Sequence, residues 1–591
     1  MAQDRYSLLL YRTSLAGCAL GVVATLYFLD GLAGYPTGAI SHSATALAST
    51  LAALFFLYVF FSGLWDRSRL GIFLWCLILV VLIVEIALGL LPPTARDELT
   101  HHLAIPRAYS KAGRILEIPF APYSYYPMLL DMLYVPWVGW QWDSIPKLIH
   151  GLFGLLTGLC LYAYLARRLS PVYGLLGFLF FATTPAILRL SHWAYVDLGT
   201  TFYSTASLLC MIRWLETRDE RKWLALAGLC AGFTMATKPN GLLATMVLAL
   251  LLAFALSKEK RLIQERAGHL FLFSLMAFIS FSPWMAKNLM WTGNPFFPLL
   301  GNLFPSATGI DSGERGGLGL LARRDLLYGE NGWQIAALPL RIFFSGQDDT
   351  PQFFDGVLNP MLILFLPWAF KGKWVDEKKR LFAFSSLYLL YAVFLVEMRI
   401  RYILPLVPPL VILLVYGIHN IYLRIRHPSF LAVSVTLLWL WNGIYLWNHV
   451  GAVSPWDYLR GREGREAYLS RMLSDYPAIR YANQTLPSTS KIYFLFTGRR
   501  VYYSERDYFH DPGDNAWVLA RMIQTAQDAK DLRLKLAQSG ATHLLVREDL
   551  LQRFLNDNLA PEQLRLWSTF AQGHLQGLFH ARGYSVYQIH G

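Results

Sequence analysis

Long apolar runs separated by short polar stretches fill the first three quarters of the chain. Most of these runs approach the ~20 residues that an α-helix needs to cross a bilayer. The pattern predicts about thirteen membrane-spanning helices, over residues 14–30, 42–64, 70–91, 145–166, 172–188, 198–215, 223–237, 239–256, 268–291, 356–370, 381–396, 402–422 and 430–449. The runs at 223–237 and 356–370 are short for a span.

The charges between the runs predict which side each loop faces. Every second connection is short and basic: DRSR (66–69), RRLS (167–170), ETRDERK (216–222), SKEKR (257–261), KGKWVDEKKR (371–380) and RIRH (424–427). Cytoplasmic loops carry an excess of Lys and Arg. We therefore expect a multi-pass protein of the inner (plasma) membrane with a cytoplasmic N-terminus. The remaining connections, and the C-terminal residues, are then extracytoplasmic or periplasmic.

The pattern changes after Pro455. Short runs of β-branched and aromatic residues at 491–496, 542–546 and 584–589 predict strands, and residues 516–540 have a helical period that ends in Gly. We expect a transmembrane domain over 1–454, with external loops at 92–144 and 292–355, followed by a soluble α/β domain over 455–591. The middle of the 292–355 loop is Gly-rich.

Composition supports this reading. Hydrophobic residues make up 55% of the 591 residues and charged residues only 15%, and mean hydropathy is +0.37. The net charge of +13 is typical of cytoplasmic loops in a membrane protein and does not indicate nucleic-acid binding. All five cysteines lie inside apolar runs, so they cannot cross-link the outer domain, and no zinc spacing occurs.

Two acids and two histidines follow the third apolar run directly. The stretch RDELTHH places Asp97, Glu98, His101 and His102 at the expected membrane surface. Hydrated loop residues are one explanation. Ionisable groups held near a bilayer are costly, however, and are often functional. Either histidine could also orient a carboxylate or ligate a metal.

Further ionisable residues lie at other predicted outer turns. Asp197 opens a span, where an N-cap and a phosphate or metal site are both open explanations. Lys238 lies between two runs and could anchor at the interface. Arg399 and Arg401 are on the outer side, against the usual charge bias. Arg binds phosphate bidentately, so an anionic ligand competes with surface anchoring as the explanation.

These residue types fit one chemistry. A sugar carried on a lipid phosphate would place its phosphate at the interface, near Lys and Arg, and its sugar outside. Transfer to a hydroxyl needs a carboxylate that takes the acceptor proton as the anomeric carbon gains oxocarbenium character. One base opposite the leaving phosphate gives inversion in a single displacement.

The chain resembles the polytopic GT-C glycosyltransferases, especially the branch with lipid A aminoarabinose transferase and the protein O-mannosyltransferases. The resemblance rests on RDELTHHLAIPRAY, YSYYPMLLDMLY, WAYVDL, TKPNGLLA and RYILPLVPPL, in this order and on one side of the membrane. It implies that Asp97 is the catalytic carboxylate with Glu98 supporting it, and that Asp197 is a second acid. It matches Lys238, Arg399 and Arg401 to donor-phosphate positions only approximately.

The resemblance also implies the partners. They are a polyprenyl-phosphate sugar donor and a lipid, protein or glycan acceptor, which no motif identifies. A divalent metal at Asp97, Asp197 and His101 is allowed but not required. Two spans precede the one before the acidic pair, whereas relatives commonly have one. The alternatives are a transporter or flippase for a lipid-linked or anionic substrate, and an O-antigen ligase or polymerase.

Overall fold

The structure is a computed structural model that describes residues 2–34, 39–63, 66, 68–218, 220–259, 262–304, 320–371, 375–395 and 398–590. The chain divides into two compact units. The first, the helical unit, comprises Met1–Leu91, Ala112–Ile115 and Tyr125–Pro455. The second, the α/β unit, comprises Pro92–Lys111, Leu116–Ser124 and Trp456–Gly591. Segment 92–124 is thus divided between the units, and most of it belongs with the C-terminal residues.

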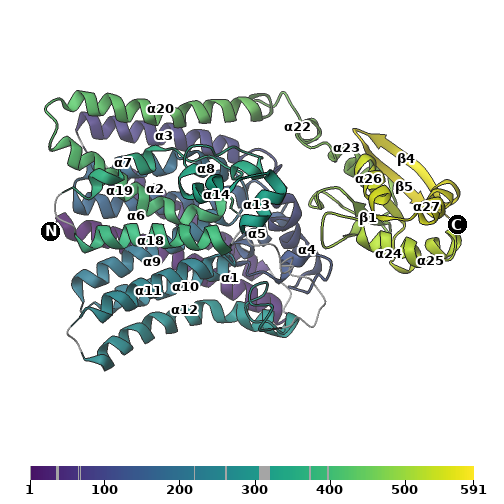
Figure 1. Cartoon of the computed structure of the whole chain (residues 1–591), viewed down its shortest axis with the longest axis horizontal. Helices are drawn as coiled ribbons and strands as arrows, with labels where there is room; N and C mark the ends of the chain where they lie inside the picture. The colour runs from purple at the N-terminus through teal and green to yellow at the C-terminus, as the bar shows by residue number, and fades with distance from the viewer. Residues whose placement is uncertain are drawn as a thin grey trace. The chain divides into compact units, whose positions relative to one another are not determined.

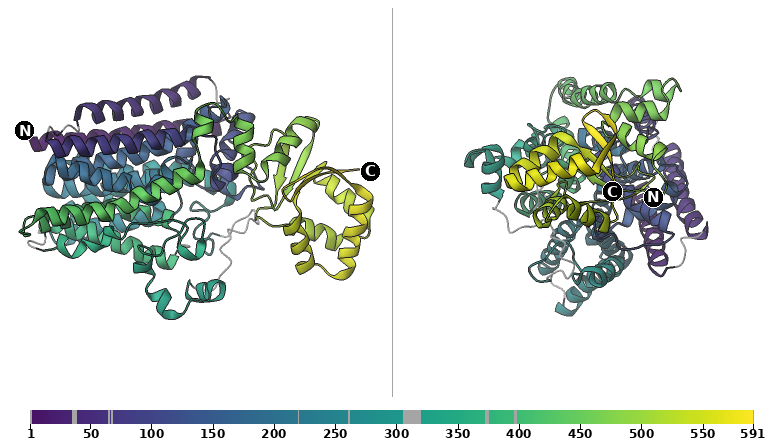
Figure 2. Two further views of the ribbon diagram at one scale, coloured as in Figure 1. Left: turned by 90° about the horizontal axis from the view of Figure 1, so that it is seen from above. Right: turned by 90° about the vertical axis from the view of Figure 1, so that its right-hand side faces the viewer.

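Long helices that run side by side build the helical unit (Figures 1 and 2). They are α1 (Ala2–Leu32), α2 (Ala39–Gly63), α3 (Arg69–Gly89), α5 (Leu129–Gly139), α6 (Ile145–Arg168), α7 (Pro171–Ala182), α9 (Asp197–Thr217), α10 (Arg221–Thr237), α11 (Gly241–Ser257), α12 (Ile263–Thr292), α18 (Asp376–Leu395), α19 (Val407–Tyr422) and α20 (Pro428–Val453). The shorter helices are α8 (Pro185–Ser191), α13 (Leu320–Tyr328), α14 (Gly332–Ala336), α15 (Leu338–Arg341), η3 (Pro351–Phe353), α16 (Met361–Leu364), α17 (Leu366–Ala369) and η4 (Ile400–Leu406).

The polytopic helical architecture is confirmed, but the number of helices long and apolar enough to span is smaller than predicted. Within the described ranges seven helices meet both conditions, or eight if the pair α7 and α8 counts as one span. Helices form over the runs at 198–215, 223–237, 239–256 and 381–396 without meeting them. One continuous helix over 356–370 is wrong. Pro360 and Pro367 lie at the starts of the short helices α16 and α17. Proline lacks the backbone N–H that a continuous helix would need at these positions, so the helix is interrupted.

Proline also explains the bend of 71° between α7 and α8. The hydroxyls of Thr183 and Thr184 donate back to the carbonyls of Leu179 (2.6 Å) and Phe180 (2.8 Å), which satisfies the last turn of α7. Pro185 then begins α8, at a first-turn position that tolerates proline.

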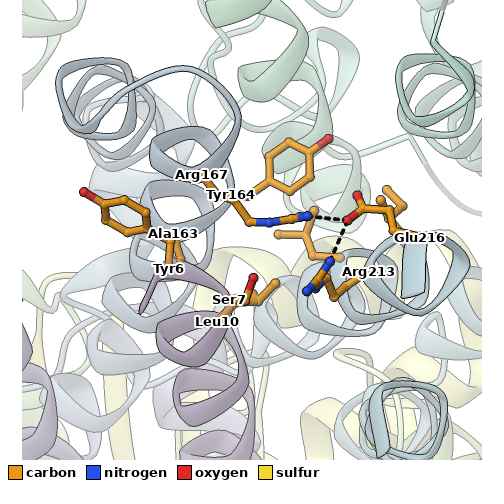
Figure 3. Close-up of a pocket in the computed structure, with 10 residues that line it drawn as sticks. Tyr6, Ser7, Leu10, Ala163, Tyr164, Arg167, Arg213 and Glu216 are labelled. Atoms are coloured by element: carbon orange, nitrogen blue, oxygen red, sulfur yellow. Dashed lines mark hydrogen bonds and ion pairs between the residues drawn. The ribbon is translucent and has the colours of Figure 1, made fainter. Parts of the chain in front are cut away.

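Ion pairs connect three of the basic loops, 167–170, 216–222 and 371–380, at one end of the helical unit. Arg167 and Arg213 both donate to Glu216, at 2.5 and 3.1 Å, beside a small pocket between α1, α6 and α9 (Figure 3). Arg168 pairs with Glu216 and also with Glu377 at the start of α18. These contacts bring together the ends of α6 and α9 and the beginnings of α1 and α18.

The opposite ends of the same helices meet elsewhere. Asp197 at the start of α9 pairs with Lys238 after α10, and the side chain of Asn240, before α11, donates to the carbonyl of Tyr402 in η4. Each of α9, α10 and α18 therefore has one terminus at each end of the unit. The candidate site residues of the helical unit, Asp197, Lys238 and Arg401, lie at the end away from the basic loops.

The α/β unit contains one five-stranded sheet with the order β2-β1-β3-β5-β4. The strands are β1 (Lys491–Leu495), β2 (Asp507–His510), β3 (His543–Arg547), β4 (Leu575–Ala581) and β5 (Tyr584–Ile589), and the helices are η1 (Glu98–His102), α4 (Ala104–Ala112), η2 (Pro122–Tyr125), α21 (Trp456–Leu459), α22 (Arg465–Met472), α23 (Tyr476–Thr485), α24 (Trp517–Thr525), α25 (Ala529–Gln538), α26 (Glu548–Asn558) and α27 (Pro561–His574). Strand β1 is parallel to β2 and β3, whereas β5 is antiparallel to β3 and β4.

Helices α24 to α27 cover one face of this sheet and share its apolar core. Leu495 and Val546 of the strands pack in one buried cluster with Ile523, Leu536 and Phe570 of the helices. The small mixed-sheet domain is confirmed, but the single helix over 516–540 is wrong. Residues 526–528 separate α24 from α25, because the side chain of Asp528 accepts from the backbone N–H of Asp531 (2.8 Å) and starts a new helix.

Candidate active site

The two predicted catalytic acids have different environments. Glu98 is fully buried, and its Oε2 accepts hydrogen bonds from the backbone N–H groups of Thr94 (3.0 Å) and Ala95 (2.8 Å). Its carboxylate therefore closes the turn that precedes η1. Asp97 is partly exposed. Of the two carboxylates, Asp97 is the more exposed, and Glu98 holds the local backbone.

The two histidines lie close together in the same segment, and one of them stacks on a tyrosine. The ring of His101 lies 4.2 Å from that of Tyr123, nearly parallel at 20°, and 4.1 Å from that of His102. Its Nδ1 is 2.8 Å from the hydroxyl of Thr100. The segment is a π-helix, a rare form that accommodates one extra residue in a turn and is frequent at functional sites.

Backbone contacts join this segment to the C-terminal part of the α/β unit. The carbonyl of Leu99 accepts from the N–H groups of Val501 and Tyr502, both at 3.1 Å. The hydroxyl of Tyr503 donates to the carbonyl of Pro93 at 2.7 Å, and Arg107 pairs with Glu505. The connection between β1 and β2 thus supports the segment that carries Asp97.

A second cluster lies in the helical unit. Lys238 Nζ is 2.6 Å from Asp197 Oδ1, with the Asp197 side chain 1% exposed and the Lys238 side chain 18% exposed. Asp197 Oδ2 is buried and accepts no hydrogen bond from any described residue. Asp197 does not cap α9 with its side chain. The N-cap explanation for this residue is therefore wrong, and its partner is a cation.

Aromatic rings complete this cluster. Lys238 Nζ lies 4.8 Å from the centre of the Tyr402 ring, and the Arg401 guanidinium lies 5.1 Å from that ring and 5.5 Å from the ring of Tyr195. The hydroxyl of Tyr388 donates to the Tyr402 carbonyl at 3.0 Å. Lys238 therefore pairs with a buried carboxylate, and a second cation, Arg401, lies against the same Tyr402 ring.

Arg399 has a different partner. Its Nη1 is 3.3 Å from Asp355 Oδ2. Arg189 pairs with Asp348 (2.8 Å) and Asp349 (2.6 Å) and lies 3.8 Å from Asp355. Arg399 thus belongs to a network that fixes the end of the 292–355 loop, whereas Arg401 faces the cluster of Asp197 and Lys238.

The structure therefore groups the predicted residues in two sets, one in each unit. Asp97, His101 and Asp197, the proposed metal ligands, are divided between the units, so the structure does not test them as a set. Among the described residues no three His, Cys, Asp or Glu side chains are close enough together to hold a metal ion.

Several buried ionisable residues escaped the sequence analysis. Lys147 is buried and donates to the carbonyls of Leu88 (3.2 Å) and Leu91 (2.9 Å) at the end of α3. Glu85 is 3.1 Å from His192 Nδ1, and the Nε2 atoms of His192 and His449 are 3.0 Å apart. A lone charged residue within an apolar run, such as Glu85 within residues 70–91, was the signal that could have indicated these buried residues.

Comparisons with known proteins found one family model and several solved structures that are similar to this chain. Residues 147–287 match the model of the family described as dolichyl-phosphate-mannose-protein mannosyltransferase. ArnT from Cupriavidus metallidurans in the apo state is 14% identical, with a TM-score of 0.54 over 87% of this chain and 97% of that chain. The structure of the same protein bound to undecaprenyl phosphate gives a TM-score of 0.47 at 14% identity, over the same shares of both chains.

The Archaeoglobus fulgidus oligosaccharyltransferase with zinc and sulfate gives a TM-score of 0.48 at 12% identity, over 87% of this chain and 73% of that chain. A comparison with curated protein sequences found no match. The fold is that of apo ArnT. With the family segment at 147–287, this confirms the resemblance to GT-C enzymes. The chain thus has the fold of a polytopic membrane protein, and its residues 147–287 are similar to a mannosyltransferase family.

Proposed function

We propose that the protein transfers a sugar from a polyprenyl-phosphate donor to a hydroxyl of an extracytoplasmic lipid, protein or glycan acceptor. The observation that carries this proposal is the place of two cations beside Asp197. Lys238 pairs with this buried carboxylate, and Arg401 lies against the same Tyr402 ring, at the end of the helical unit away from the basic loops. A lipid phosphate at the membrane surface is an anion of matching charge and depth.

In the proposed reaction Asp97 is the general base. It takes the proton of the acceptor hydroxyl while that oxygen bonds to the anomeric carbon, and the bond from the anomeric carbon to the phosphate oxygen breaks. The configuration inverts in one displacement. Lys238 and Arg401 stabilise the charge that develops on the departing phosphate. Glu98 acts through the backbone hydrogen bonds that fix the turn beside Asp97.

The topology is part of the same proposal. Residues 356–370 form a broken crossing, since Trp368, near its end, accepts from Asn420 at the far end of α19. Added to the seven long apolar helices, this broken crossing, α9, α10, α11, α18 and the bent pair of α7 and α8 give thirteen crossings. With a cytoplasmic N-terminus, an odd number of crossings leaves the α/β unit on the extracytoplasmic side. Reporter fusions after residues 220 and 500 should then report opposite compartments. The same compartment for both would refute the topology.

Sugar release tests the function. The purified protein, reconstituted with a panel of polyprenyl-phosphate monosaccharides, should release polyprenyl phosphate from one of them, and a deletion strain should accumulate that donor. A transporter or flippase would move the lipid without breaking the glycosidic bond. An O-antigen ligase or polymerase would consume a lipid-linked glycan and leave the monosaccharide donors intact. Either pattern would replace the present proposal.

A further inference from the structure

A strained cationic turn follows strand β1. Residues 496–500 read FTGRR, and we refer to them as the FTGRR turn. Phe496 and Arg499 have φ angles of 54° and 57°, and Gly498 lies between them at 67°. A residue other than glycine costs about 1–3 kcal/mol in such a conformation, and such strain gathers at ligand sites. Two strained residues in five make this turn a candidate for ligand binding.

The turn occupies the ligand-binding edge of the sheet. Strand β1 is parallel to both of its neighbours, β2 and β3. In open α/β sheets, ligands bind beyond the carboxyl ends of parallel strands. The N–H of Gly498 donates to Asp514 (3.1 Å), and Arg499 Nη1 donates to the Pro512 carbonyl (2.7 Å). The turn is therefore fixed to the loop that follows β2.

The two arginines of the turn have different partners. Arg500 Nη1 is 3.4 Å from Asp475, a carboxylate that is 1% exposed, so its charge is compensated. Arg499 forms no ion pair with any residue that the structure describes, whereas the Nε atoms of both arginines are buried without a hydrogen-bond acceptor there. A guanidinium with unused donors and no carboxylate partner is suited to a phosphate or carboxylate group.

The Asp97 segment lies beside Arg499 within the α/β unit. The Arg499 guanidinium is 5.3 Å from the centre of the Tyr123 ring, and that ring stacks on His101. The backbone of the next residue, Val501, donates to Leu99 at 3.1 Å. Arg499 is thus connected on two sides to the segment that carries the proposed base.

We propose that Arg499 binds a phosphate or carboxylate group of the glycosyl acceptor and selects for anionic acceptors. That the ligand is an acceptor rests on the proposed function. The donor phosphate already has Lys238 and Arg401 in the helical unit. Arg499 lies beside the segment that carries Asp97, the residue proposed to take the proton of the acceptor. Tyr123 holds the guanidinium by its ring face, which leaves the edge of the fork for the anion.

Direct binding to the full-length protein in neutral phosphatidylcholine nanodiscs tests this. The probes are decyl glucoside 6-phosphate and uncharged decyl glucoside. The wild-type protein should prefer the phosphate, and Arg499→Gln should abolish the preference, a loss of about 10–100-fold for charge-assisted hydrogen bonds. Arg499→Lys should retain part of it, which covers the case in which Arg499→Gln does not fold.

The matched control is Arg553→Gln, in which the removed side chain is 81% exposed on α26 of the same unit and binding should be unchanged. An Arg499→Gln protein that keeps the preference would overturn the proposal. So would Arg499→Gln that weakens polyprenyl phosphate binding instead, because the donor would then be the ligand. Binding requires no turnover, so a wild-type protein that prefers the phosphate but releases no sugar would count against the proposed function alone.

Discussion

Replacing Lys238 by Met should destabilise the fold, because it leaves Asp197 charged and buried. The Asp197 side chain is 1% exposed, its Oδ1 is 2.6 Å from Lys238 Nζ, and its Oδ2 has no hydrogen-bond partner among the described residues. Breaking a buried pair by removing one partner costs about 3–5 kcal/mol. The same change at Lys222, whose pair with Glu220 is 2.7 Å but has side chains 56% and 39% exposed, should cost at most about 1 kcal/mol.

Denaturant titration of the purified protein in detergent measures both values. Adding Asp197→Asn to Lys238→Met removes the stranded charge and should recover most of the lost stability, so the double-mutant cycle should give a coupling of several kcal/mol. Donor binding should stay weak in the double mutant, because the cation is still missing. If Lys238→Met cost no more than the Lys222 control, the pair would be hydrated. If the double mutant were as unstable as the single one, the stranded carboxylate would not be the cause.

Three further outcomes follow from the described contacts. Asp97→Asn should lower the transfer rate by roughly 10²–10⁴ with donor binding intact, and normal turnover by this variant would refute the assignment of Asp97 as the base. Glu98→Gln should lower the free energy of unfolding by about 1–2 kcal/mol and should lower the transfer rate less than Asp97→Asn does. Arg401→Gln should raise the donor KM, and unchanged kinetics would return Arg401 to an anchoring role. Burial lowers the pKa of His510 to about 4, so folding favours the neutral ring. This stabilisation, about 3 kcal/mol, is present above pH ~6.5 and lost as the pH falls towards about 4; a denaturation series should show the loss in the wild type but not in His510→Gln.

Most of the helices could be predicted from the apolar periodicity of the sequence. The sequence indicates where three helices begin, at Pro171, Pro185 and Pro428, since proline is favoured in the first helical turn. Strand β2 has four residues and an exposed first position, so it lacks a clear alternation. Strand β4 begins directly after α27, at Leu575, without a turn residue. Neither strand had a local signal that the sequence analysis could have used.

Partner choice within the site was beyond the sequence. The charge bias indicated that Lys238, Arg399 and Arg401 face one side, but all three had the same expected role. The structure pairs Lys238 with Asp197, 41 residues away, and Arg399 with Asp355. Which carboxylate neutralises which cation depends on how the helices pack, and this cannot be predicted from the spacing of residues along the chain.

The hydrogen bonds from Val501 and Tyr502 to Leu99 have a consequence for synthesis. A ribosome completes the π-helix at residues 98–102 some four hundred residues before it makes the strand connection that holds it. Until that connection emerges, the segment bearing Asp97 has no partner for this carbonyl and no backing for its fold. In a nascent chain, the segment bearing Asp97 would therefore be fixed only after the strand connection has been made, and the activity proposed for Asp97 would begin no earlier than that step.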